Sequence, residues 1–175
     1  MKLTPVAQKF ILHWGEMGTR WGVNRTVAQI HALLFLSPSP LDAEEIAKTL
    51  SVARSNVSTS LRELQSWRIV KVVHVYGDRR DHYESMKDVW QMFRIILEER
   101  KKREIDPTLE TLESSVHEAE KAGKEDQYTR ERLTEMLDFF KIIASSYEEF
   151  RNMPTESAVK LLKLGGKVRK FLGAA

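Results

Sequence analysis

The stretch from Leu41 to Ser85 constrains the fold more than any other part of the chain, because it reads as helix, tight turn, helix, strand, turn, strand. Asp42 and Glu45 have the spacing of an acidic capping pair at the start of a helix. The apolar residues of this helix recur at helical spacing: Ala43, Ile46, Ala47 and Leu50. Ser51 and Val52 interrupt the pattern, which predicts a tight turn before a second helix.

The second predicted helix runs from about Ala53 to Trp67 and has two different faces. Its apolar stripe consists of Val57, Leu61 and Leu64. The opposite face carries arginines and short hydroxyl side chains. Short side chains allow a close approach to a groove wall, and a guanidinium can fork onto guanine or phosphate. The pattern predicts a recognition helix that enters the major groove of DNA.

A β-hairpin is predicted directly after this helix. Its first strand is the β-branched run Val70–Tyr76, Gly77 and Asp78 give a turn signal, and the return strand is Asp81–Glu84. A hairpin in this place is a wing. Arg79 and Arg80, which follow the turn, can reach a minor groove or its phosphates. We expect Asp78 and Asp81 to brace these arginines or to shape the turn.

The residues predicted to contact DNA are Arg54, Ser55, Asn56, Ser58, Thr59, Arg62, Arg79 and Arg80. In the alternative interpretation, Arg54 and Arg62 belong to the solvated face of an ordinary small α+β domain. That alternative requires the order of the motifs and the wing to be a coincidence, so we favour DNA binding.

The motifs resemble those of the MarR superfamily of winged-helix regulators. The segments that carry the resemblance are Arg54–Ser58, Leu61–Leu64 and Gly77–Glu84, in this order. Asp88–Trp90 and the later Arg100–Glu104 are similar to the GbsR branch of that superfamily, named for a glycine-betaine synthesis repressor. The resemblance extends over about residues 4–107. The chain departs from the family pattern at Ser51, where many members have Gly, and at Ala53, where many have Ser.

The composition excludes several classes of protein. The 175 residues include no cysteine, so disulfides, thiolate catalysis and cysteine-ligated metals are excluded. No signal peptide is visible and no apolar run approaches the ~20 residues of a membrane span, so we expect a cytoplasmic protein with no membrane partner. The formal net charge of +3 agrees with an anionic partner, although the arrangement of the basic residues says more than their sum.

Helices are predicted on both sides of the winged stretch. Thr4 followed by Pro5 signals the first helix, and Asn24 caps a second, largely apolar one. A helix after the wing is predicted to end in the charged run 98–104, a new one to start at Asp106, and Gly165 with Gly166 to break the last helix. The predicted fold class is mainly α with a minor α+β component. Residues 1–106 form a winged helix-turn-helix domain, and residues 107–175 form a C-terminal helical dimerisation extension.

The apolar faces of the first helix and of residues 133–150 would be exposed in a monomer, which favours a homodimer. A two-fold dimer presents two recognition helices ~34 Å apart and implies a pseudo-palindromic operator. If the two faces instead packed on each other within one chain, a monomer would read one half-site weakly.

The GbsR resemblance implies a choline-like quaternary ammonium effector. Such cations bind aromatic cages, and the candidate cage residues are Trp14, Trp21, Trp90 and Phe93. The alternative is that all four are ordinary core aromatics.

We therefore predict a sequence-specific double-stranded-DNA-binding transcriptional regulator that acts as a repressor. The alternative is a winged-helix module that binds proteins and has no specific DNA target. An enzyme is not expected, because none of the five histidines lies in an H-E-x-x-H motif and no phosphate-binding glycine loop is present. We expect no cofactor and no metal, although His82 and Glu84 share one strand face beside Asp78 and Asp81.

Overall fold

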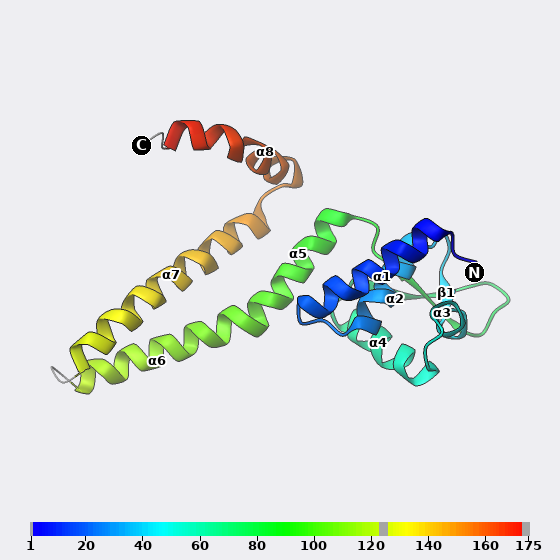
Figure 1. Cartoon of the computed structure of the whole chain (residues 1–175), viewed down its shortest axis with the longest axis horizontal. Helices are drawn as coiled ribbons and strands as arrows, with labels where there is room; N and C mark the ends of the chain where they lie inside the picture. The colour runs from blue at the N-terminus through cyan, green and yellow to red at the C-terminus, as the bar shows by residue number, and fades with distance from the viewer. Residues whose placement is uncertain (1, 123–125, 173–175) are drawn as a thin grey trace. The chain divides into compact units, whose positions relative to one another are not determined.

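The computed structural model describes residues 2–122 and 126–172, with side chains described up to residue 164. The chain forms two compact units, residues 1–96 and 97–175, and each is described by itself. Most described residues are helical, and the strands form one small antiparallel sheet (Figure 1). This confirms the predicted fold class of a winged helix-turn-helix domain with a helical extension.

The first unit contains the winged helix-turn-helix fold. Its elements in chain order are α1 (Pro5–Arg20), α2 (Arg25–Leu36), β1 (Leu41–Asp42), α3 (Ala43–Leu50), α4 (Arg54–Ser66), β2 (Val70–His74) and β3 (Asp81–Ser85), followed by the start of α5 (Val89–Arg100). Three predicted caps are present: Thr4 accepts from the backbone N–H of Ala7, Asn24 accepts from that of Thr26, and Asp42 forms a full capping box with Glu45. The starts of α1, α2 and α3 therefore follow from local side-chain signals.

Helix α2 is the centre of the core, as its apolar circumference predicts. Ile30, Leu33 and Leu34 are fully buried on it, and α1, α3 and α4 pack around it. Two glycines of α1 permit a close contact with α2. A Cβ at Gly15 would lie 2.6 Å from Cγ of Gln29, and one at Gly18 would lie 2.5 Å from Cβ of Ala28.

The sheet has the order β1-β3-β2, with both pairs antiparallel. Two details differ from the prediction. Strand β1 was not predicted, because it has only two residues and exists through its pairing of Leu41 with Tyr83 and of Asp42 with His82. Strand β2 ends at His74, two residues earlier than expected, so Val75 and Tyr76 belong to the tip of the wing.

Lys87 fastens the segment after the wing to the end of α2. Its Nζ donates hydrogen bonds of 2.9, 2.8 and 2.9 Å to the carbonyl oxygens of Leu34, Phe35 and Ser37. A cation at the C-terminal carbonyls of a helix is stabilised by the helix dipole. This contact joins two segments that are far apart in the sequence.

The helix after the wing does not end in the charged run 98–104, contrary to the prediction. It continues through a π-helical segment η1 (Lys101–Ile105) into α6 (Asp106–Ala122), and the N–H of Asp106 donates to the carbonyl of Lys101. The reason lies in Pro107, whose ring would clash with the carbonyl four residues before it in a regular α-helix. One wider turn removes the clash without breaking the helix. Lys101 stabilises this turn with an ion pair of 2.7 Å to Asp106.

In the second unit, α6 packs against α7 (Gln127–Asn152), and α8 (Thr155–Leu172) follows. Leu112, Ala119 and Leu137 are buried, whereas one stripe of α7 remains exposed: Met136, Phe139 and Ile142. Helix α8 continues through Gly165 and Gly166, so the predicted break there is wrong. Two glycines cost a helix about 2 kcal/mol relative to alanine but do not forbid it.

The contact-based units divide within α5, between Ile96 and Leu97. The boundary at residue 106, based on function, stays a prediction. None of the helices in the described parts of the chain has the length and apolar character needed to cross a membrane.

Candidate nucleic-acid interface

The candidate interface starts with helix α4, which is fixed by three apolar side chains. Val57, Leu61 and Leu64 are buried in the core, as the stripe predicted, and Ser60 is buried beside them. The predicted contact residues lie on the rest of the surface. Arg54, Ser55, Asn56, Thr59 and Arg62 are exposed, and Ser58 is half-buried. The structure therefore places these residues on the accessible side of one helix.

The two arginines of α4 interact with hydroxyl groups. Arg54 Nη1 donates to Ser58 Oγ, which itself donates to the Arg54 carbonyl at 3.1 Å. Arg62 Nη2 lies 3.4 Å from Thr59 Oγ1. Within the described residues, no carboxylate forms an ion pair with either guanidinium. Their charge is therefore not neutralised by the protein and remains available to an external anion.

The start of α4 has no side-chain cap. Ala53 occupies the N-cap position with φ −62° and ψ 140°, and no side-chain hydrogen bond is made there. This agrees with the weak helix start expected from its methyl side chain. The exposed face of α4 thus begins with backbone N–H groups and Arg54, both of which favour a negatively charged partner.

The wing is a hairpin with a tightly held tip. Gly77 has a φ of 81°, a conformation that suits glycine, and the N–H of Asp78 donates to the carbonyl of Val75 at 3.0 Å. The N–H of Arg80 donates to Asp78 Oδ1 at 3.0 Å. His82 is buried, and its Nδ1 lies 3.0 Å from the Arg80 carbonyl. The tip is therefore closed by hydrogen bonds on both sides of the turn.

Arg80 has a different role from its neighbour Arg79. Its Nε lies 3.0 and 3.1 Å from the two oxygens of Asp78, its Nη2 pairs with the same carboxylate, and its Nη1 reaches Asp42 at the start of α3. Arg79 is exposed, and in the described parts of the chain no hydrogen bond or ion pair engages it. The prediction grouped the two arginines, but the structure commits Arg80 to bracing the wing and leaves Arg79 open to solvent.

The electrostatics of this brace follow from its contacts. The side-chain hydrogen bond from Arg80 holds the pKa of the Asp78 carboxyl far below its usual value and raises the pKa of Arg80. Burial alone would raise the pKa of Asp42. The backbone N–H groups of Glu45 and Glu44 and the charge of Arg80 outweigh burial and lower it. Both carboxylates therefore stay ionised near neutral pH.

Sequence reasoning missed two participants. Asp42 was identified only as a helix cap, and its pairing with Arg80 spans 38 residues, which no local pattern reveals. Tyr76 was assigned to a strand, but it lies fully exposed at the tip of the wing. The signal that could have identified it is an aromatic residue directly before the turn residues Gly77 and Asp78.

The four predicted effector residues all lie in the first unit. Trp14 stands edge-to-face against Trp21, with ring centroids 5.9 Å apart and planes at 87°, and Phe10 stacks on Trp14 at 5.5 Å. Trp90 is half-buried and Phe93 is exposed on α5. The structure thus brings together Trp14 of α1 and Trp21, the residue that follows this helix, and the cage as a whole stays a prediction.

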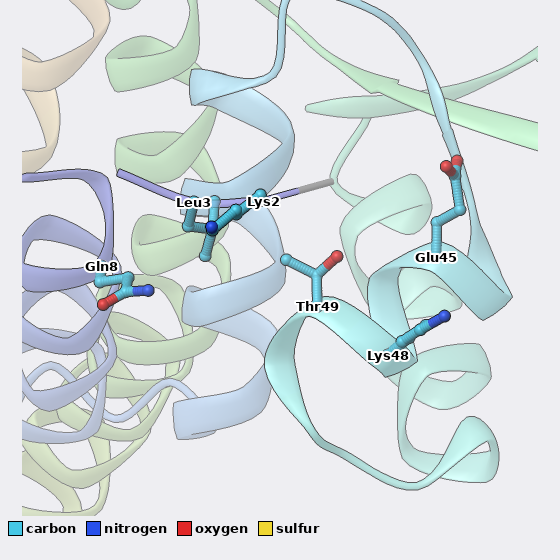
Figure 2. A pocket seen from close by; sticks show the side chains of 6 residues that line it. All are labelled: Lys2, Leu3, Gln8, Glu45, Lys48 and Thr49. Carbon is cyan, nitrogen blue, oxygen red and sulfur yellow. The ribbon is translucent and has the colours of Figure 1, made fainter. Parts of the chain in front are cut away.

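A hollow of about 510 Å³, lined mostly by polar and charged residues, lies between the N-terminal segment, α1 and α3 (Figure 2). Its lining residues are Lys2, Leu3, Gln8, Glu45, Lys48 and Thr49. None of the four predicted aromatic residues contributes to it, so it is not the predicted effector site. Among the described side chains there is no group of His, Asp and Glu residues with the arrangement of a metal site.

The fold of the chain and the sequence of residues 21–81 each resemble known proteins. A search of curated proteins found no match. One similar solved structure, the crystal structure of a transcriptional regulator, is 18% identical with a TM-score of 0.63; the match covers 84% of this chain and 96% of that one. At this identity the likeness shows a shared fold. Residues 21–81 match the model of the MarR family. The segment that holds α2, α4 and the wing tip is therefore similar to the MarR family domain.

Proposed function

We propose that the chain is a sequence-specific regulator of transcription that binds double-stranded DNA and acts as a repressor. The observation that carries this proposal is the exposed face of α4 on a winged-helix fold. There two arginines that pair with no carboxylate of the described residues lie among short polar side chains. A repressor bound to a promoter excludes RNA polymerase sterically. The proposed role is therefore regulatory and not enzymatic.

In the proposed complex α4 lies in the major groove. The residues assigned to it are Arg54, Ser55, Asn56, Ser58, Thr59 and Arg62. Arg62 lies two turns after the helix start and is assigned to a guanine edge, because a guanidinium pairs with O6 and N7 of guanine through two hydrogen bonds. Arg54, beside the first N–H groups of the helix, is assigned to a phosphate.

The wing lies at the adjacent minor groove. Arg79, which is exposed, is assigned to the groove or its phosphates. Arg80 contributes by fixing the wing to α3, and the exposed part of its side chain can still face the DNA backbone.

Dimerisation is proposed through the helical extension. The exposed stripe of Met136, Phe139 and Ile142 on α7 supports it, because an apolar helix face without a covering element usually marks an interface. A two-fold axis would place two copies of α4 ~34 Å apart on a pseudo-palindromic operator. Sedimentation equilibrium tests this, and a monomer at micromolar concentration contradicts it.

A GbsR-type regulator that responds to a choline-like cation is the finer form of the proposal. The edge-to-face pair of Trp14 and Trp21 supports an aromatic site, since quaternary ammonium groups bind aromatic faces. The assignment also includes Trp90 and Phe93 on α5. Titration of choline against tryptophan fluorescence and operator binding tests it, and the absence of a response in both removes choline.

The deciding experiment is selection of bound duplexes from a random pool with the full chain. Enrichment of an inverted repeat supports the proposal. Arg62→Ala should then cost ~1–3 kcal/mol and relax preference at one base pair, whereas Arg79→Ala should lower the salt slope by ~1. Arg132→Ala is the control, because this exposed arginine of α7 pairs with Glu135. A pool with no enriched motif favours the alternative of a protein-binding winged helix.

A further inference from the structure

The tip of the wing carries an aromatic side chain that the fold does not use. Tyr76 is fully exposed, with a relative accessibility of 106%, and no other large hydrophobic residue described in the structure is as exposed. Val75 beside it is also exposed, at 41%. An isolated exposed apolar residue needs no explanation by itself. For Tyr76, two properties of its surroundings indicate a role.

The first of these is rigidity. The turn that carries Tyr76 is closed by the bond from the N–H of Asp78 to the Val75 carbonyl, and the Arg80 guanidinium ties the tip to Asp78 and Asp42. Tyr76 is therefore presented by a hairpin whose conformation is already fixed. A preorganised group loses little entropy on binding, so its contacts contribute more to affinity.

The second is charge. Asp78 is paired with Arg80, which also binds Asp42, so among the residues that the structure describes the only charged group of the tip without a protein partner is Arg79. A tyrosine that lies three residues from a free arginine on a narrow loop combines an apolar ring, a hydroxyl donor and a cation. A polyanion with apolar sugar walls and hydrogen-bond acceptors has the matching chemistry.

The minor groove of DNA has these properties. Its walls are deoxyribose rings, its floor presents acceptors on A·T pairs, and the exocyclic amino group of guanine obstructs the floor of G·C pairs. Arginines are attracted to the narrow groove of A·T-rich DNA. Proteins that enter this groove also use apolar side chains as wedges.

We propose that Tyr76 is a specificity-determining residue of the wing: with Arg79 it enters the minor groove beside each half-site and selects A·T-rich flanks. This inference rests on the proposed function. The ring packs on the sugar walls, and the hydroxyl donates to an acceptor on the groove floor. Arg79 supplies the charge, and Tyr76 reads the absence of the guanine amino group.

The test uses the full chain and the selected duplex, with changes made only in the flanks. Replacing adenine by 2,6-diaminopurine adds a minor-groove amino group. The base still pairs with thymine, with one additional hydrogen bond, and its major-groove edge is unchanged. Wild type should bind such a duplex about 5- to 30-fold more weakly, and Tyr76→Ala should bind the A·T duplex more weakly by a similar factor, as expected for one lost aromatic contact. Tyr76→Ala should no longer distinguish the two duplexes. Its salt slope should equal that of wild type, because no charge is lost.

Two further variants make the test specific. Tyr76→Phe keeps the ring and should lose less affinity than Tyr76→Ala. Tyr128→Ala is the matched control, because Tyr128 is also an exposed tyrosine near an arginine, 5.8 Å from Arg132, but lies on α7. It should discriminate between the two duplexes as wild type does.

The outcomes separate this inference from the proposed function. If Arg62→Ala weakens binding but Tyr76→Ala binds every duplex like wild type, the role of Tyr76 is overturned and the proposed function stands. If Tyr76→Ala weakens binding but still discriminates against the added amino group, the minor-groove reading by Tyr76 is also overturned. If wild type binds no duplex, both proposals fail.

Discussion

Replacing Ala53 by serine should stabilise the protein by adding the missing side-chain cap of α4. Ala53 is exposed at the N-cap of α4, and its φ of −62° and ψ of 140° are those of an extended N-cap residue. The backbone therefore needs no rearrangement, and an exposed hydroxyl pays no desolvation cost. Thr4 shows the bond that serine would make, because its Oγ1 accepts from the N–H of Ala7 at 3.2 Å.

The expected gain is ~1 kcal/mol, the usual difference between Ser and Ala at an N-cap. If residues 1–96 unfold as one cooperative unit, this corresponds to a rise in Tm of roughly 4–8 °C. Urea titration of wild type and Ala53→Ser measures the gain directly, since a change in midpoint without a change in slope reports stability.

Two controls make the measurement decisive. Thr4→Ala removes an existing cap and should lose ~1 kcal/mol. Ala53→Asp should stabilise the helix as serine does. Its carboxylate would add a negative charge to the face proposed to contact DNA phosphates, so its DNA affinity should fall. If Thr4→Ala destabilises the protein while neither variant at Ala53 stabilises it, the account of the α4 start is refuted.

Three further predictions concern the same domain. Burial, and then the charge of Lys87, lower the pKa of His31 to about 4. As the pH falls below ~6.5, this histidine is therefore protonated in the unfolded chain before it is protonated in the folded one, and about 2 kcal/mol of stability should be lost between pH 7 and pH 5. His31→Leu should flatten this pH dependence in urea titrations. Ser51 has a left-handed φ of 54°, so Ser51→Gly should relieve backbone strain. Glycine also raises the conformational entropy of the unfolded chain, which opposes this gain. The net increase in stability, measured by thermal unfolding, should be ~0.5 kcal/mol. Asp42→Asn keeps a good cap for α3 but removes the carboxylate that binds Arg80. The backbone amides of the wing tip should then exchange faster with deuterium, and those of α3 should not. Unchanged exchange at the tip would show that the contact between Arg80 and Asp42 is unimportant.

The features that depend on neighbouring residues could be predicted from the sequence. Thr4, Asn24 and Asp42 cap helices within three residues of themselves, and these starts agree with the structure. The buried face of α4 and the wing follow from apolar spacing and from the turn at Gly77. Periodicity and capping are local interactions, so one sequence is enough to read them.

The features that were missed depend on distant contacts or on balanced alternatives. The two-residue strand β1 exists only through its pairing with β3. The Arg80 side chain could be solvated or could pair with Asp42, and Asp42 lies 38 residues away in the sequence. The charged run before Pro107 contains no helix-ending residue of its own, and a single π turn proved sufficient to carry the helix past the proline. At Gly165 the weak helix propensity of glycine was outweighed by the helix around it.

Asp42 combines three tasks: it caps α3, it pairs with β3, and it holds Arg80. Truncation of its side chain would remove the cap and the contact with Arg80 together, whereas none of these contacts involves residues 75–77 or Arg79. The tip residues of the wing can therefore change during evolution while Asp42 and its contacts stay constant. If α4 and the wing bind DNA as proposed, a change of a few tip residues would alter the recognised flanks and leave α4 unchanged.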